Sequence, residues 1–160
     1  MKTDVIYKGI KKYFGIHELV GKRTVKKYGQ RAWRFLDPKT LHTLLIIREN
    51  ITHKGKSNLS ITVNTPRLQQ RGLRTNIQQI VRNKSLRNRL YISAHVQGKA
   101  FDFDVKGMTA AQVRKWIIKN RKLFPYKIRL ENKMNGKPIS WVHLDTVWEP
   151  QNKGVHLFDV

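Results

Sequence analysis

Apolar residues recur at helical spacing in three segments of the chain, and each segment is predicted to form a helix. The clearest covers residues 38–50 and begins after Asp37, a preferred N-cap residue that is followed here by a proline. A second covers residues 109–122 and opens with a capping box, in which a Thr and a Gln side chain satisfy each other's backbone N–H groups. A third helix is expected within residues 76–89.

Short runs of β-branched and aromatic residues, several alternating with polar ones, predict a series of strands. These strands are expected at residues 59–63, 90–93, 100–105, 126–131 and 141–147. The last two are separated by a predicted turn, Asn-Gly-Lys-Pro, at residues 135–138. Helices and strands are mixed without a regular β-α-β order, so we expect an α+β fold with a small, mainly antiparallel sheet flanked by helices. No linker or repeat divides the sequence, which predicts a single domain over residues 1–160.

The composition, with 39% hydrophobic and 9% aromatic residues, is typical of a globular protein. No run approaches the ~18 apolar residues that a transmembrane helix needs. The lysine-rich residues 1–13 lack an apolar core, so no signal peptide is expected, and action outside the cytoplasm would require a separate route of release. Cysteine is absent, which excludes disulfides and thiolate metal sites and leaves His and carboxylates as metal ligands.

The net charge of the chain indicates a class of binding partner. The chain has 33 Lys and Arg residues against 10 Asp and Glu residues, a net charge of +23. A protein this basic is attracted to polyanions, which include nucleic acids, anionic cell-wall polymers and acidic membrane surfaces. The basic residues are spread along the chain instead of forming one tail or one recognition helix, so the charge does not choose among these partners.

One histidine stands out by its neighbours. His95 follows a predicted strand, a turn at Gly98 comes next, and Asp102 lies in the following strand. Strand alternation places Asp102 on the face opposite Phe101 and Phe103. A carboxylate beside two apolar side chains is costly unless it is paired or bound to a metal, so Asp102 is a candidate ligand.

A second histidine, His143, lies in the last predicted strand, on the same face as Trp141 and Asp145. With His95 and Asp102 it offers two imidazoles and one carboxylate. Three such ligands leave a fourth coordination position of zinc open for water, which is the catalytic arrangement. Zinc then lowers the pKa of that water towards ~7, and a nearby carboxylate is needed to take its proton.

These residues resemble a known family. Ser-x-His-x-x-Gly-x-Ala-x-Asp over residues 93–102, followed by Trp-x-His-x-Asp over residues 141–145, is similar to the zinc D-alanyl-D-alanine carboxypeptidases. That group includes the vancomycin-resistance dipeptidases and the phage L-alanyl-D-glutamate endolysins, and its fold is shared with the Hedgehog signalling domain. The resemblance covers roughly the second half of the chain. It implies one zinc ion held by His95, Asp102 and His143, and hydrolysis of amide bonds in peptidoglycan stem peptides.

The resemblance also implies groups that bind the substrate. The family carries an Arg before the first His, and Arg74 fits that place, with Arg71 as the second choice. Ser93 and Trp141, which belong to the two motifs, are further candidates. A basic hydrolase without a leader suits a phage-type lysis enzyme, made in the host cytoplasm and acting on the wall after release. A virion-associated enzyme or a bacterial origin stays open.

The general base is the position where this chain departs from the family. Many members have Glu or Asp three residues before the final His, where this sequence has Ser140. A serine hydroxyl cannot replace a carboxylate base. Glu131 is favoured instead, because a hairpin between its strand and the next would bring it close to His143. Asp145 is the second candidate, although a carboxylate two residues from a ligand more often orients a histidine.

Two other functions remain open at this point. The chain is either a catalytically inactive zinc-binding virion or structural domain, which the serine at the usual base position favours, or a basic nucleic-acid-binding module, which the charge favours. No helix-turn-helix, zinc-finger or RNA-binding motif is visible, and the hypothesis of a nucleic-acid-binding module leaves the His, Gly and Asp pattern unexplained. The sequence does not predict which peptide bond is cut.

Overall fold

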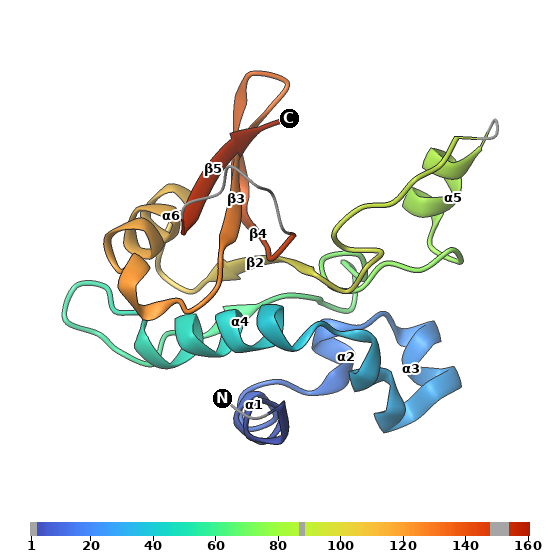
Figure 1. The fold of residues 1–160 in the computed structure, drawn as a ribbon, viewed down its shortest axis with the longest axis horizontal. Coiled ribbons are helices and arrows are strands. Elements are labelled where there is room, and N and C mark those ends of the chain that lie inside the picture. The colour runs from blue at the N-terminus through green and yellow to red at the C-terminus, as the bar shows by residue number, and fades with distance from the viewer. Residues whose placement is uncertain (1–2, 87–88, 148–153) are drawn as a thin grey trace.

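A five-stranded sheet with the strand order β1-β2-β4-β3-β5 organises the molecule (Figure 1). The computed structural model describes residues 3–86, 89–147 and 154–160. The strands are β1 (Ile61–Thr62), β2 (Ala100–Val105), β3 (Ile128–Met134), β4 (Lys137–Asp145) and β5 (Val155–Asp159). An α+β fold is therefore confirmed, with helices and strands in one chain but no regular alternation.

The sheet is mixed, which corrects the prediction of a mainly antiparallel sheet. The pairs β1–β2, β2–β4 and β3–β4 are antiparallel, but β5 pairs with β3 in parallel. The prediction ended the sheet at residue 147 and did not include β5. β5 lies on the side of β3 away from β4, so it is an edge strand running in the same direction as β3 (Figure 1).

The helices are α1 (Thr3–Ile10), α2 (Ile16–Leu19), α3 (Lys22–Tyr28), η1 (Gly29–Phe35), α4 (Pro38–Asn50), α5 (Gln79–Ser85), α6 (Ala110–Lys119) and η2 (Arg121–Leu123). Helix α4 confirms the first predicted helix, and an Asp37 oxygen accepts from the backbone N–H groups of Lys39 and Thr40 at 2.8 and 3.2 Å. Helix α6 confirms the second, with its capping box between Thr109 and Gln112.

Three predicted elements are smaller than expected or absent. The strand at 59–63 is reduced to β1, because only Ile61 and Thr62 pair with β2. The helix within 76–89 is reduced to α5; residues 87 and 88 of that prediction lie outside the described residues. The strand at 90–93 does not form, because Leu90 and Ile92 are 86% and 61% exposed and no strand within the described residues pairs with them.

The core lies between the sheet and helices α4 and α6. Phe101 and Phe103 of β2 are fully buried, and they share one apolar cluster with residues of α4 and α6. The N-terminal helices, which apolar spacing did not reveal, extend this cluster, and α1 packs against α4. Side chains alternate between the two faces of a strand, so the helix-covered face holds the apolar residues and the opposite face carries Asp102. Among the described residues no helix is both long and apolar enough to cross a membrane.

Candidate metal centre

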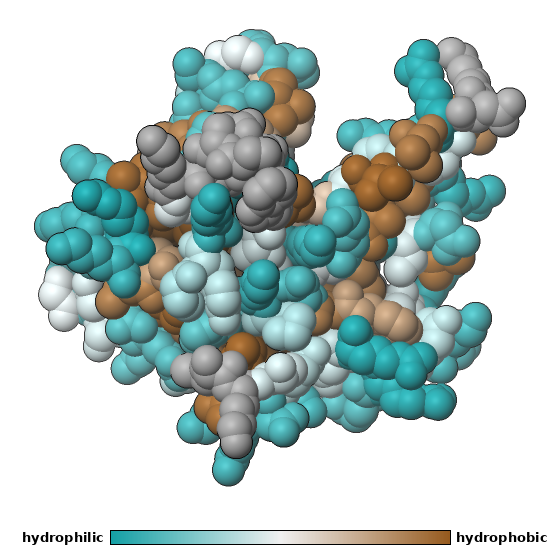
Figure 2. Space-filling view, viewed as in Figure 1, coloured by the Kyte–Doolittle hydropathy of each residue, from teal (hydrophilic) through white to brown (hydrophobic). Residues whose placement is uncertain are grey.

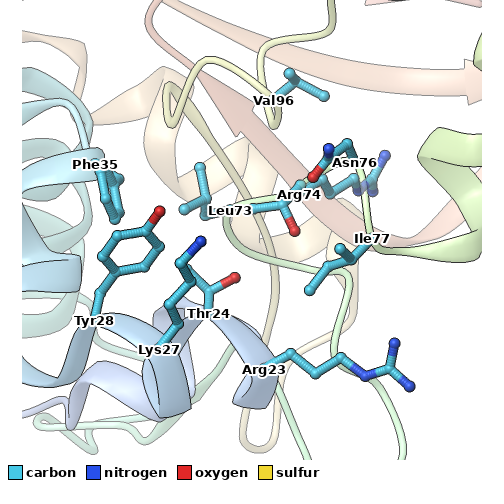
Figure 3. Close-up of a pocket in the computed structure, with 11 residues that line it drawn as sticks. Arg23, Thr24, Lys27, Tyr28, Phe35, Leu73, Arg74, Asn76, Ile77 and Val96 are labelled. Atoms are coloured by element: carbon cyan, nitrogen blue, oxygen red, sulfur yellow. The ribbon is translucent and has the colours of Figure 1, made fainter.

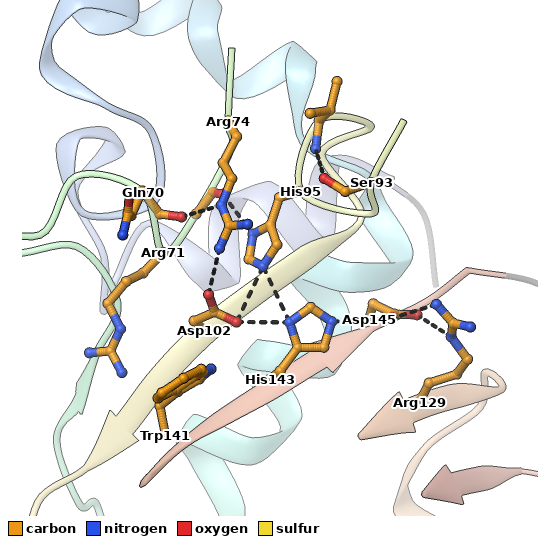
Figure 4. Close-up of polar contacts among 12 residues, drawn as sticks. Gln70, Arg71, Arg74, Ser93, His95, Asp102, Arg129, Trp141, His143 and Asp145 are labelled. Atoms are coloured by element: carbon orange, nitrogen blue, oxygen red, sulfur yellow. Dashed lines mark hydrogen bonds and ion pairs between the residues drawn. The ribbon is translucent and has the colours of Figure 1, made fainter. Parts of the chain in front are cut away.

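Two histidines and one aspartate converge on the sheet face opposite the core. One ligand atom from each of His95, Asp102 and His143 lies within 4.8 Å of the others. His143 Nδ1 is 2.8 Å from Asp102 Oδ1, and His95 Nε2 is 3.2 Å from both Asp102 Oδ1 and His143 Nδ1 (Figure 4). All three residues are buried. The sequence prediction had grouped these residues, and the fold brings them together; their role as ligands stays a prediction.

The strand register places two of the three. Asp102 on β2 lies directly opposite His143 on β4, so the two side chains project from neighbouring strands on the same face. His95 comes from the loop before β2, whose turn depends on Gly98. This glycine has φ +69°, and an added Cβ would lie 2.0 Å from the backbone oxygen of Phe35. Only glycine permits both the conformation and the close approach, and together they set the position of His95.

Each imidazole is oriented by an acceptor on its outer side. His95 Nδ1–H donates to the backbone oxygen of Gly72 at 2.9 Å, and His143 Nε2–H donates to Asp145 Oδ2 at 3.2 Å. A carbonyl and an ionised carboxylate can only accept, so each of these ring nitrogens carries a hydrogen. The other nitrogens, Nε2 of His95 and Nδ1 of His143, face the centre. Histidine ligands of metals are held in this way.

The chain itself keeps the acceptor for His95 in place. Gly72 lies so close to the α2 segment that a Cβ would be 2.0 Å from the backbone oxygen of Leu19. Leu73 N donates to that same oxygen at 3.0 Å. The N-terminal helices therefore reach the site through the backbone, because they fix the strand-like segment whose carbonyl orients His95.

The donors fit a metal cation. Burial lowers the pKa of His143, but hydrogen bonds to Asp102 and Asp145 outweigh burial and raise the pKa to about 9. Burial raises the pKa of Asp102, yet its hydrogen bonds to the two histidines hold that pKa well below its ordinary value. Burial lowers the pKa of His95, which favours the neutral form that a metal ligand needs. Two imidazole nitrogens and one carboxylate oxygen thus lie close together on the inner side of the group, and this is a donor set that a metal cation binds.

Both carboxylate oxygens of Asp145 are occupied by hydrogen bonds within the protein. Its carboxylate accepts from Arg129 Nε at 2.9 Å, Arg129 Nη2 at 3.0 Å and the backbone N–H of Val147 at 3.0 Å, in addition to His143. Burial alone would raise the pKa of Asp145, but these contacts bring that pKa below its ordinary value. The side chain is fully buried. Both oxygens are engaged, so Asp145 orients His143 and has no oxygen open to a reacting water.

Glu131 is the carboxylate with an open oxygen. It lies on β3 directly opposite His143, and it is 7% exposed. Its Oε1 is buried and has no hydrogen-bond partner among the described residues. Burial raises the pKa of Glu131. A buried carboxylate oxygen without a partner is costly, and such groups often serve a reaction.

The two arginines predicted to bind substrate have different ion-pair partners. Arg74 Nη2 lies 2.8 Å from Asp102 Oδ2, the oxygen that faces away from the histidines, and Arg74 Nε donates to the backbone oxygen of Gln70 at 2.6 Å. Arg71 pairs at 2.6 Å with Asp104, and in Figure 4 the Arg71 side chain points away from the group of three. Arg74 thus positions a candidate ligand, and Arg71 does not reach the centre.

A cavity of about 330 Å³ adjoins the three residues, and its lining includes Ser93, Trp141 and Glu131. A separate cavity of about 420 Å³ lies between α3, η1 and residues 73–77 (Figure 3). Its walls are formed by side chains such as Tyr28, Phe35 and Leu73, and it contains none of the three candidate ligands. The chemistry of the donors therefore selects the smaller cavity.

Sequence reasoning missed two groups beside the centre. Arg129 was not proposed for the site, although its spacing of two from Glu131 places both on one face of β3. Phe158 of β5 packs its ring edge-on against His143, with 6.1 Å between the ring centroids, and the Arg129 guanidinium lies over Phe158 at 4.8 Å. No local pattern could have shown that contact, because it depends on the parallel pairing of β5.

Comparisons of the chain with family models, with curated proteins and with solved structures found no match. The fold and the site define a protein of α+β class with a buried His–Asp–His group that could hold a metal ion.

Proposed function

We propose that this chain is a zinc-dependent peptidase that hydrolyses amide bonds in the stem peptides of peptidoglycan, with a fold of the Hedgehog and D-alanyl-D-alanine peptidase type. One observation carries the proposal: Glu131, with a buried and unpartnered oxygen, lies opposite His143 in a cavity shared with His95 and Asp102. A structural metal site has no need of such a carboxylate, whereas a hydrolase needs one.

The donor set supports zinc. Two imidazole nitrogens and one carboxylate oxygen suit that ion and leave a coordination position open, as in catalytic sites. When bound, zinc lowers the pKa of a coordinated water and polarises the scissile carbonyl. The outward hydrogen bonds from His95 to Gly72 and from His143 to Asp145 hold both rings for this role.

The chain's own residues then divide the work. Glu131 takes the proton of the attacking water and returns it to the leaving amine, for which its raised pKa suits it. Asp145 holds His143, and Arg74 holds Asp102. Ser140, at the family's usual base position, is exposed and its hydroxyl cannot replace a carboxylate base, so it has no part in the proton transfer.

The charge supports a wall substrate. A net charge of +23 attracts the protein to anionic cell-wall polymers, and this attraction weakens as salt is added. We propose a phage-type lysis enzyme on this ground and on the motif resemblance. The competing function, a zinc-binding domain without turnover, would show the same metal affinity and the same charge, so it is separated only by the role of Glu131.

The test measures release of muropeptides from purified sacculi by mass spectrometry, with zinc content determined on the same samples. Wild-type protein should release peptides and lose this activity on chelation. Glu131→Gln should bind zinc normally but release peptides about 10²- to 10⁴-fold more slowly. Glu49→Gln, which alters a carboxylate on α4, is the matched control and should match the wild type. Equal lysis by Glu131→Gln and wild type would refute the assigned base, and intact sacculi with full zinc content would refute the enzyme.

A further inference from the structure

The cavity beside the candidate centre is lined by three cations, of which two are already paired. Arg74 is paired with Asp102 and Arg129 with Asp145. The third, Lys84, comes from the last turn of α5. Within the described part of the chain, no carboxylate lies within ion-pair distance of Lys84. It is therefore the cation in this lining whose charge the protein does not neutralise with an acid.

An aromatic ring holds Lys84 in place. Its Nζ lies 5.1 Å from the centroid of the Tyr91 ring. A cation over an aromatic face is attracted by the ring but keeps its full charge, so this contact positions Lys84 without cancelling it. Burial alone would raise the pKa of Tyr91, yet hydrogen bonds to Ser93 and Arg74 and the charges of Lys84 and Arg74 lower that pKa. The Tyr91 hydroxyl thus lies in the same positive field.

Lys84 lines three cavities, two of which adjoin the candidate centre. It lines the 330 Å³ cavity over the metal centre and an adjoining cavity of about 470 Å³. The two cavities also share Arg74, Asp102, Met134 and Trp141, so they form one continuous cleft. This cleft runs between the β3–β4 hairpin and the α5 arm, which we define as the described residues 76–86 and 89–92. The surface is hollowed between these two parts (Figure 2).

The two walls of the cleft differ in charge. The sheet wall carries Asp102, Glu131 and Asp145. The arm wall carries no acid, because the chain has no Asp or Glu between Glu49 and Asp102. Asp102 and Asp145 are paired with Arg74 and Arg129, whereas Lys84 has no acid beside it among the described residues, so the arm wall is where the cleft attracts an anionic group.

We propose that Lys84 binds a carboxylate of the substrate that flanks the scissile amide, and so selects acidic peptides over neutral ones. This inference rests on the proposed peptidase function. A peptide that places its scissile carbonyl at the His95, Asp102 and His143 group lays its neighbouring residues along the cleft, within reach of the arm wall. Lys84 is a specificity residue, since it acts on the substrate's charge and not on the reacting atoms.

The test uses two synthetic stem peptides that differ only in a free carboxylate or a carboxamide beside the scissile bond. Zinc-loaded wild-type protein should cleave the carboxylate peptide with a kcat/KM about 10- to 100-fold higher, as one charge-assisted hydrogen bond provides. Lys84→Met should bring this ratio close to one, through a higher KM for the carboxylate peptide. Arg82→Met removes the same charge from the same helix but not from this cleft, and should keep the wild-type ratio.

Binding of both peptides to the zinc-loaded protein is measured in parallel by calorimetry. If Lys84→Met lowers cleavage of both peptides equally, or keeps the ratio, the inference is wrong. If the wild type cleaves neither peptide yet binds the carboxylate peptide in a manner that depends on Lys84, the proposed hydrolysis fails and the recognition role stands. Equal binding of the carboxylate peptide by wild type and Lys84→Met would overturn the inference whether or not cleavage occurs.

Discussion

The two walls of the cleft are built on opposite principles. On the sheet wall, Glu131, His143 and Asp145 are buried and their strands are in direct register. On the arm wall, Lys84 is exposed and Leu90 is 86% exposed. Under the proposed function, the sheet wall holds the groups that need fixed geometry, and the arm wall holds the group that needs only charge. A Coulomb attraction falls off slowly with distance, whereas metal coordination and proton transfer tolerate little displacement.

The rigidity of the sheet wall comes from a chain of polar contacts. Arg129 binds Asp145, Asp145 orients His143, His143 contacts Asp102, and Asp102 binds Arg74. The chain crosses strands β3, β4 and β2 and ends in the segment before the arm. Each member satisfies its neighbour, so the loss of one leaves a buried polar group without its partner.

The largest effect on zinc affinity is expected at His143, in the middle of this series of polar contacts. His143→Ala removes Nδ1, one of the three candidate ligand atoms, so zinc affinity should fall by more than ~100-fold. This loss is larger than the one expected when a residue that only hydrogen-bonds a ligand is replaced. Calorimetric titration with zinc measures the change. His156→Ala on the edge strand β5 is the control and should bind like the wild type. Wild-type affinity in His143→Ala would show that the metal lies elsewhere.

The comparison also predicts different contributions to stability. Leu130 is fully buried on β3, so Leu130→Ala should lower the free energy of unfolding by about 2–5 kcal/mol. Leu90 on the arm is exposed, and Leu90→Ala should change that free energy by less than ~0.5 kcal/mol. Urea denaturation of both variants decides the matter. A large loss in Leu90→Ala would mean that the arm is packed against the molecule and is no open wall.

A smaller effect is expected from the partner of His143. Asp145→Asn keeps the shape of the side chain but weakens the contacts to Arg129 and to His143, so zinc affinity should fall about 10- to 100-fold. Competition with a coloured chelator measures the affinity. Asp159→Asn, on the exposed end of β5, serves as the control. If the two variants bind zinc equally, Asp145 does not orient the ligand.

Much of the sheet wall could be predicted from the sequence because its rules are local. Alternation placed Asp102 opposite the two buried Phe residues of β2, and the hairpin turn predicted that Glu131 would lie near His143. Both placements are seen in the structure. The cap of α4 and the capping box of α6 were readable for the same reason, since each is set within four residues.

The remaining parts depend on distant contacts. The carbonyl of Gly72 orients His95 only because the α2 segment lies against it, and Phe158 reaches His143 only through the parallel pairing of β5. The apolar residues of the arm suggested a strand that does not form, because a strand needs a partner as well as a pattern. The role proposed for Lys84 could not be predicted from the sequence, because it depends on which side chains the fold places around this lysine.

The central claim is that His95, Asp102 and His143 hold one metal ion. Anomalous diffraction from a zinc-loaded crystal, recorded on both sides of the zinc absorption edge, tests it most directly. We predict one strong zinc peak bonded to His95 Nε2, to His143 Nδ1 and to an Asp102 oxygen at about 2.0–2.2 Å. A zinc peak on other residues, or none at this group in a fully loaded protein, would contradict the account.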